Sequence, residues 1–293
     1  MSIIYYIPEE DVSDLKARMK STKLRDNIHI QYVIRENASM YPVNALRNKA
    51  IDAVQTSHFY ISDMDVWPSP STYDALRSLP DSLLSDEKLA IIVPAYEIKM
   101  IPCSTFEQCI SFYKIYYPKT KGELRSCLAE KRCHTFRPRE WLHDYYPNDW
   151  FYSQSMTIPV PCWKSDTQEP YVVVKKIPGM PRFNESFVGY AFNKVQWLEH
   201  LRYVGYRFEV LVNGYSVDIP HPPSAFRNEF FNIISKTRIF PMFDVYQDFL
   251  RHLNETEEDK SVMGLCPKAR RQPRRVWFAS DVAKLKKKNK TKS

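Results

Sequence analysis

Short runs of apolar residues recur along the chain, and their spacing predicts β-strands. In some runs apolar and polar residues alternate, and in others the run is continuous, as in strands buried on one or both faces. These runs occupy residues 3–7, 29–34, 59–61, 89–93, 171–174 and 207–212. Between the first two runs, Val12, Leu15 and Met19 follow helical spacing. This strand–helix–strand opening predicts a parallel sheet and an α/β fold.

Longer stretches with apolar residues three or four positions apart predict helices. One helix covers about residues 44–55, immediately before the strand at 59–61, and Asn44 is its candidate N-cap. Further helices are predicted at residues 72–79, 120–130 (opened by Thr120), 195–202 and 230–249. Residues 97–118 and 131–168 show no clear period and are predicted to be irregular.

The strand at 59–61 leads directly into two aspartates. Asp63 and Asp65 are one residue apart, and side chains at i and i+2 of an extended segment point to the same side. In open α/β sheets, ligands bind beyond the carboxyl ends of the strands. Two carboxylates at that place suit Mg²⁺ or Mn²⁺ carrying a diphosphate. The structural alternative for an isolated Asp-x-Asp is a solvated turn or a helix cap, so the preceding strand and helix are what favour a metal site.

Composition narrows the function classes. The 293 residues include 44% hydrophobic and 14% aromatic residues, enough for a sizeable core. Only six glycines occur, and no G-x-G-x-x-G or P-loop motif is present, which argues against a nucleotide fold built on a glycine-rich loop. The net charge of +8 is concentrated at the C-terminus, because residues 268–293 carry +10 and the remainder about −2.

This charge distribution predicts a globular domain over residues 1–255 and a basic, disordered tail over 256–293. Since the body is not basic, nucleic-acid binding is disfavoured. Electrostatic attachment of the tail to RNA, a membrane or acidic glycans is the alternative for that segment.

The cysteines and the glycosylation sequons bear on the cellular compartment in which the protein folds. No C-x-x-C pair occurs among the six cysteines, which argues against a zinc site; disulfides are the alternative in a secretory protein, with a pairing the sequence does not define. Asn-x-Ser/Thr sequons begin at Asn37, Asn184, Asn254 and Asn289. They permit a glycosylated lumenal protein. No apolar run is long enough for a transmembrane helix, and the N-terminus does not have the pattern of a signal peptide.

Several segments in a fixed order resemble glycosyltransferase family 49, which includes LARGE-type and β-1,4-glucuronyltransferase-like enzymes. The first three are Tyr-Pro-Val-Asn-Ala-Leu-Arg-Asn at 41–48, Tyr-Ile-Ser-Asp-Met-Asp at 60–65 and Ile-Val-Pro-Ala-Tyr-Glu at 92–97. The similarity continues through residues 117–124, 169–174, 187–194 and 219–224, and it spans roughly residues 1–250.

The resemblance implies a GT-A fold, Rossmann-like with a mostly parallel sheet. It also implies manganese-dependent (or magnesium-dependent), inverting transfer of a glucuronic acid-like sugar from a UDP-sugar to a glycan hydroxyl in the Golgi lumen or membrane. Asp63 and Asp65 match the family's metal- and nucleotide-binding pair. The metal would neutralise the departing diphosphate, and a carboxylate base would deprotonate the acceptor hydroxyl.

The chain departs from the family pattern at three places near the expected site. Asp218 stands where the family has a histidine as third metal ligand; aspartate is a competent oxygen ligand, and His221 is the second candidate. Asn184 replaces a family aspartate, and residues 144–148 replace a Gly-His-x-Pro-Thr segment. These changes bear on the choice of donor or acceptor, and on activity itself.

Other candidates have both a functional and a structural interpretation. Glu169 is a candidate base or sugar-hydroxyl acceptor, or else a strand-end cap or salt-bridge partner. Asn193 lies where an acceptor pocket is expected, with a helix N-cap as its alternative. Arg47, Asn48 and Asn44 are candidates for orienting the donor; for Arg47 the alternative is a surface salt bridge.

Trp141, Trp150 and Trp163 are candidates for stacking on sugars, with core packing as the more common role of a tryptophan.

Residues 3–7 resemble the family's second strand, so the first β-α unit, whose loop holds the uridine, is expected to be missing from this sequence. Either the sequence is a fragment of a longer protein or the domain is degenerate. The alternative function is therefore a catalytically inactive, glycosyltransferase-like binding protein.

Overall fold

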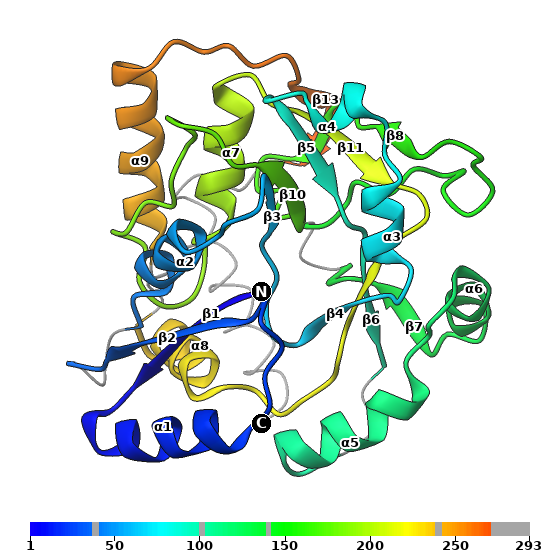
Figure 1. Ribbon diagram of the computed structural model, residues 1–293. Helices are drawn as coiled ribbons and strands as arrows, with labels where there is room; N and C mark the ends of the chain where they lie inside the picture. The colour runs from blue at the N-terminus through cyan, green and yellow to red at the C-terminus, as the bar shows by residue number, and fades with distance from the viewer. Residues whose placement is uncertain (37–40, 100–102, 139–141, 238–241, 271–293) are drawn as a thin grey trace, which may run out of the picture.

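The structure, a computed structural model, describes residues 1–36, 41–99, 103–138, 142–237 and 242–270. These residues form a mixed α/β protein with two principal sheets. Figure 1 shows the larger sheet in the upper half of the molecule and the smaller one below it.

The larger sheet has five strands in the order β3-β10-β5-β11-β8. They are β3 (His58–Tyr60), β10 (Val172–Lys175), β5 (Leu89–Ile92), β11 (Arg207–Leu211) and β8 (Thr157–Pro159). Only β5 and β11 are parallel; β10 is antiparallel to β3 and β5, and β8 is antiparallel to β11. The expectation of a mostly parallel sheet is therefore wrong. It fails because β5 and β10 are not joined by a single helical crossover, the connection that makes neighbouring strands parallel; several other strands and helices lie between them in the chain.

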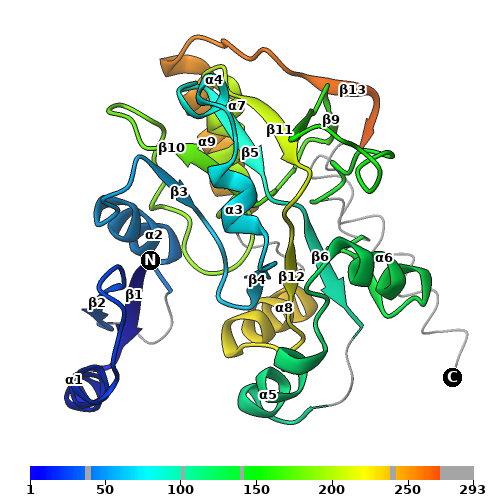
Figure 2. The same cartoon turned by 45° about the vertical axis from the view of Figure 1, so that its right-hand side comes forward.

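Side chains of β5 alternate between two cores, one on each face of this sheet. Ala90 and Ile92 belong to the core shared with Trp197 of α7, whereas Leu89 and Ile91 pack with α3 and α4. The covering helices are α3 (Thr72–Arg77), α4 (Asp81–Leu84) and α7 (Val195–Tyr203). Figures 1 and 2 show α3 and α7 on opposite sides of the sheet. Because both faces are covered, β5 consists only of buried residues, as its continuous apolar run predicts.

The smaller sheet has the order β4-β12-β6-β7. Its strands are β4 (Val66–Pro68), β12 (Ser216–Asp218), β6 (Ala95–Ile98) and β7 (Cys133–Thr135). Three strands of the larger sheet continue into it through short connections, namely 61–65, 93–94 and 212–215. The Asp-x-Asp segment therefore lies at the junction between the two sheets.

The N-terminal unit is the predicted β-α-β structure. Strands β1 (Ser2–Ile7) and β2 (His29–Ile34) pair in parallel through η1 (Glu9–Asp11) and α1 (Val12–Ser21), which confirms the interpretation of that pattern. They form a separate two-stranded sheet, and β1 packs against α2 (Val43–Asp52). Figure 2 shows this blue unit at the edge of the molecule.

The segments expected to be irregular contain regular elements. Residues 97–118 contain the end of β6 and the helix α5 (Phe106–Tyr116), and residues 131–168 contain β7, β8 and β9 (Trp163–Ser165). Between these segments lies α6 (Lys121–Ala129), which begins with the predicted Thr120 cap. Thr120 and Glu123 form a reciprocal capping box, so this helix start was readable from local sequence.

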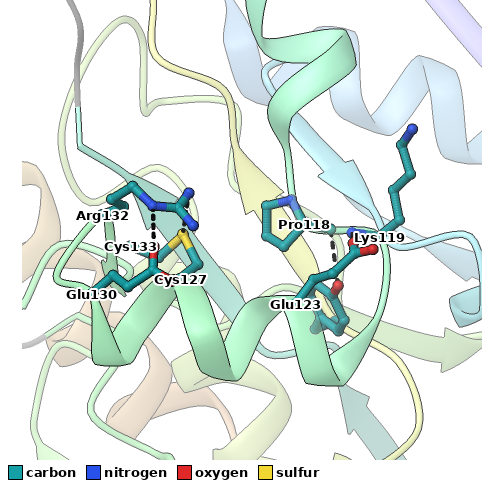
Figure 3. Close-up of a disulfide and its surroundings, with 8 residues drawn as sticks. Pro118, Lys119, Glu123, Cys127, Glu130, Arg132 and Cys133 are labelled. Carbon is teal, nitrogen blue, oxygen red and sulfur yellow. Dashed lines mark hydrogen bonds and ion pairs between the residues drawn. A yellow bond between two sulfur atoms is a disulfide. The ribbon is translucent and has the colours of Figure 1, made fainter.

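All six cysteines are paired in disulfides. The bonds are Cys103–Cys109, Cys127–Cys133 and Cys162–Cys266. Figure 3 shows the second bond, which joins the end of α6 to β7, with the Arg132 guanidinium donating to the Cys127 sulfur and to Glu130. The first two bonds close short loops, whereas the third ties distant parts of the chain together.

The C-terminal region adds two helices and a strand. The predicted helical region is divided into α8 (Ala225–Thr237) and α9 (Phe243–Thr256), and α9 packs beside α7. The expected tail does not begin at residue 256, because β13 (Leu265–Arg270) pairs with β9 and carries Cys266. Residues 271–293 lie outside the described part. None of the described helices is long and apolar enough to cross a membrane.

Candidate active site

The two aspartates lie in a turn at the junction of the sheets. The N–H of Val66 donates to the carbonyl of Asp63 (3.1 Å), so residues 63–66 turn rather than continue the extended strand. Because the backbone turns here, the two side chains contact different partners: Asp63 contacts Lys194, which precedes α7, and Asp65 contacts His221, which follows β12. They form two adjacent clusters, which we call the Asp63 cluster (with Lys194, Glu169, Tyr171 and Arg47) and the Asp65 cluster (with Asp218 and His221).

Cations surround the carboxylate of Asp63. The Lys194 ammonium donates to Oδ2 (2.6 Å), the Tyr171 hydroxyl to the same atom (2.8 Å), and Arg47 Nη2 to Oδ1 (3.3 Å). Burial alone would raise the pKa of Asp63, but the charges of Lys194 and Arg47 outweigh it and hold that pKa well below its usual range. Since 36% of the side chain remains exposed, solvent screens part of these interactions.

Lys194 joins Asp63 to Glu169. Its ammonium lies 3.1 Å from Glu169 Oε1, and the side chains of Lys194 and Glu169 are only 10% and 12% exposed. Burial would lower the pKa of Lys194, yet the two carboxylates raise it, so the lysine is charged. Its ammonium also lies over the Tyr171 ring, 4.4 Å from the centroid. A buried cation is thus held between two carboxylates on different segments.

Arg47 reaches the site from α2, as the functional interpretation of this residue requires. Besides Asp63, it donates to Asn44 Oδ1 (3.1 Å) and to Asn193 Oδ1 (2.8 Å), and its side chain is 14% exposed. Asn193 in turn donates to the carbonyl of Gly189 (2.9 Å). The N-cap of α7 is Lys194, so Asn193 does not cap that helix.

The segment that presents Asn193 and Lys194 is strained. Ala191 and Phe192 have φ angles of 77° and 54°, in the left-handed region that side chains with a Cβ rarely adopt. Phe192 is fixed there because its ring stacks on Tyr246 of α9 at 4.6 Å. Such conformations persist where the surroundings over-determine them, and they cluster at functional sites.

Asn44 and Asn48 are fully buried scaffold residues in this structure. Asn44 is not the N-cap of α2, which is Pro42; its amide donates to the carbonyl of Asn184 (2.9 Å). Asn48 donates to Glu185 Oε1 (2.8 Å) and to the carbonyl of Phe183, and accepts from the Phe183 N–H. They fix the 183–185 loop beside Arg47, and a direct contact with a donor stays a prediction.

The Asp65 cluster combines carboxylates and an imidazole. His221 Nε2 and Asp65 Oδ2 form a 2.8 Å hydrogen bond, and His221 Nδ1 faces the carbonyl of Pro222 (2.7 Å). The bond to Asp65 raises the pKa of His221 above its usual value. Burial, followed by the charge of Asp65, raises the pKa of Asp218 to about 7. The carboxylates of Asp65 and Asp218 therefore repel each other, whereas Asp63 is held between cations.

The side chains of the Asp65 cluster are suitable ligands for a divalent cation. Two carboxylates and an imidazole are ligands that Mn²⁺ accepts, and a bound cation would relieve the repulsion between Asp65 and Asp218 that raises the pKa of Asp218. Across the described ranges, however, no three His, Cys, Asp or Glu side chains are grouped closely enough to hold an ion as they stand. The His221–Asp65 hydrogen bond would have to open before both groups could coordinate.

Buried aromatic rings pack against the Asp63 cluster, where His143 stacks on Tyr171. His143 is 2% exposed, and its Nε2 is buried without a hydrogen-bond partner in the described part of the chain. Burial holds the pKa of His143 well below its usual range, so the ring is neutral. Trp150 and Trp163 are core residues, 1% and 3% exposed, and Trp141 lies outside the described residues.

Sequence reasoning missed Lys194, Tyr171 and His143. Lys194 and Tyr171 stand in segments that resemble the family, directly beside Asn193 and Glu169, and that adjacency was the available signal. His143 precedes the divergent 144–148 segment and carried no pattern of its own. All three matter here because of contacts made far along the chain.

Comparisons with known proteins agree on one family. Residues 6–218 match the family described as "Glycosyl-transferase for dystroglycan". Human xylosyl- and glucuronyltransferase LARGE1 is 32% identical over 228 residues, which are 76% of this chain and 28% of that protein. Mouse LARGE2 is 31% identical over 229 residues (76% and 31%), and chicken LARGE1 is 31% identical over 261 (86% and 32%). The chain spans about a third of the length of these relatives.

Proposed function

The chain belongs to the family of glycosyltransferases for dystroglycan, and on that premise we propose that it transfers a sugar from a UDP-sugar to a glycan hydroxyl, with inversion at the anomeric carbon. The observation that carries the proposal is the adjacency of the two clusters, one cationic and one carboxylate-rich, on a single turn. The names of the relatives support a glucuronic acid-like sugar as the group transferred. We also propose the Golgi lumen as the place of reaction.

In this proposal Arg47 contacts the donor. Its guanidinium is already aimed by Asn44 and Asn193, and an arginine fork suits phosphate oxygens. Asn48 acts at a distance by holding the 183–185 loop. Binding of an anionic donor here would compete with Asp63 for the arginine.

Asp65, Asp218 and His221 would hold Mn²⁺ or Mg²⁺ beside the donor diphosphate, while Asp63 would hold Lys194 and Arg47 in place next to the ion. When bound, the ion neutralises the charge that develops on the departing UDP. The chain's own contribution is to desolvate the ligands and to hold Asp65 in place, since the carbonyl of Asp65 accepts the Ile219 N–H (2.8 Å).

Glu169 is the proposed base. Its carboxylate is close to Lys194 and hence near the donor side of the site, while its N–H is fixed by the carbonyl of Leu142 (2.6 Å). A positioned carboxylate would accept the proton of the acceptor hydroxyl as the sugar is transferred. Asn193 would contribute to the acceptor side, next to the strained 189–192 segment.

The direct test is UDP release from a panel of UDP-sugars with Mn²⁺ present or chelated, using the 1–293 chain and an oligosaccharide acceptor. Turnover that requires both metal and donor, and that Asp65→Asn abolishes, supports transfer. Asp248→Asn is the matched control, because Asp248 is an exposed residue of α9 paired with Arg251. No turnover with any donor would rule out transfer by this chain.

The second candidate function is glycan or partner binding without transfer. It is favoured by one observation, namely that Lys194 and Arg47 both form ion pairs with Asp63. Calorimetry decides between the two: tight binding of Mn²⁺ and UDP counts against a purely non-catalytic role, and acceptor glycan binding without either supports it.

A further inference from the structure

One sequon lies on an open surface, at the end of α9. Asn254 is exposed in the last two turns of this helix, and the buried residues of the helix are Tyr246, Phe249 and Leu253. The neighbouring side chains of Arg251 and Glu258 are 66% and 78% exposed. Figure 1 shows α9 along the outer edge of the molecule. A bulky group on Asn254 would therefore extend into solvent and displace no core contact.

The disulfides supply an independent indication of compartment. All six cysteines are paired, and one bond joins residues 104 positions apart. Disulfides form and persist in oxidising compartments and are rare where glutathione keeps thiols reduced. A chain that folds with these bonds thus passes through the compartment in which asparagine sequons are modified.

From these two observations we propose that Asn254 carries an N-linked oligosaccharide. In the reaction, the Asn254 amide nitrogen forms a bond to the anomeric carbon of an oligosaccharide carried on a lipid diphosphate. The bond from that carbon to the diphosphate oxygen breaks, the amide loses one proton, and the lipid diphosphate leaves. No oxidant or reductant is needed, and the inference does not depend on the proposed transferase function.

The fold also dictates when this step occurs. Asn254 and Thr256 are two residues apart on a helix, so their side chains point to different sides. The Thr256 hydroxyl donates to the carbonyl of His252 (2.7 Å) in the folded protein. An acceptor that needs both side chains together must therefore be modified before the last turn of α9 forms.

Asn184 provides an internal contrast. It is half-buried; its Oδ1 accepts the Ser186 N–H (2.9 Å), and its carbonyl accepts the amide of the buried Asn44 (2.9 Å). An oligosaccharide there would project beside Arg47 and the candidate active site. We expect Asn184 to be unmodified in folded, secreted protein.

The test expresses the full 1–293 chain behind a cleavable secretory leader in animal cells. A variant with N37Q, N184Q and N289Q retains only the Asn254 sequon, and a quadruple variant adds N254Q. We expect the triple variant to migrate with the mass of one oligosaccharide, to lose it on treatment with peptide N-glycosidase, and to show aspartate at position 254 by peptide mass spectrometry. The quadruple variant should show no shift.

Thr256 substitutions in the triple-variant background separate the modification from folding. T256A keeps Asn254 and should lose the oligosaccharide, whereas T256S should retain it. Secreted triple variant with its three disulfides formed but with an unmodified Asn254 would overturn the proposal. So would an oligosaccharide that survives T256A.

Discussion

Asp63 and Asp65 belong to one short turn, but their electrostatic environments differ: cations surround Asp63, and a second carboxylate lies beside Asp65. Asp63 is paired with two cations and a tyrosine hydroxyl, and its pKa is depressed. Asp65 lies beside Asp218, whose pKa burial and that neighbouring charge raise to about 7. The first cluster is complete as it stands, while the second holds negative charge that a ligand would relieve. A motif of two identical residues thus contains one structural and one receptive carboxylate.

Neutralising each aspartate in turn should give different results. We expect Asp65→Asn to lower sugar transfer by about 10²–10³-fold, since removal of one charge-stabilising group typically has that effect. Folding should be unaffected. Asp63→Asn should instead lower the thermal midpoint, because Lys194 loses its closest partner. Steady-state kinetics measures the rate of sugar transfer by both variants, and calorimetry measures their thermal midpoints. Equal losses of rate and stability in both variants would contradict the different roles assigned to Asp63 and Asp65.

Glu169 tests whether the Asp63 cluster also serves chemistry. Glu169→Gln keeps the shape but removes the base, so kcat should fall by about 10²-fold or more with little change in the donor KM. The Thr167→Val variant, which alters a buried residue two positions away, controls for disturbance of this segment. A change in donor KM alone would show that Glu169 binds the donor rather than accepting a proton.

Lys194→Met should destabilise the fold by about 2–3 kcal/mol, because it leaves Asp63 and Glu169 without their shared cation. The figure is below that for a fully buried pair because Asp63 is partly exposed. Denaturant unfolding measures it. The double variant Lys194→Met/Glu169→Gln should lose less free energy of unfolding than the sum of the two single variants, because the two side chains interact. Strict additivity would contradict the Lys194–Glu169 ion pair.

The smallest expected effect concerns pH and Asp218. Its raised pKa means that the folded protein keeps a proton that the unfolded chain has lost between about pH 4 and pH 7, so stability falls as pH rises through that window. Asp218→Asn should remove this slope and add about 1–3 kcal/mol at pH 7–8 without metal. Asp63, with its lowered pKa, has the opposite sign and stabilises above pH 4. Thermal midpoints against pH, for wild type and variant, separate the two.

Local patterns predicted the elements that local interactions build. The β-α-β opening and the Thr120 cap were readable because periodicity and capping act within a few residues. Helix α5 was missed because Phe112, Ile115 and Tyr116 are apolar yet exposed, which hides the helical contrast between faces. The long central segment likewise conceals short strands whose partners lie elsewhere in the chain.

The same limit applies to the candidate site. Asp63, Asp65, Arg47 and Glu169 were identifiable from position and residue type, whereas Lys194 becomes significant only through contacts with Asp63, 131 positions away, and Glu169. Asn44 was assigned to a helix cap because its actual partner, the Asn184 carbonyl, is 140 residues distant. Sequence separation, more than chemistry, decided what could be predicted.

The Cys162–Cys266 bond encloses some residues of the candidate site in a covalent ring and leaves others outside it. It closes a ring of about a hundred residues that contains Glu169, Lys194, Asp218 and His221, while Arg47 and the aspartate turn lie outside it. Closing such a ring removes unfolded-state entropy worth about 4–5 kcal/mol in the chain-entropy model. Loss of this bond would therefore weaken the whole fold, because it enlarges the unfolded ensemble, and a thiol reductant would break the Cys103–Cys109 and Cys127–Cys133 bonds outside the ring as well.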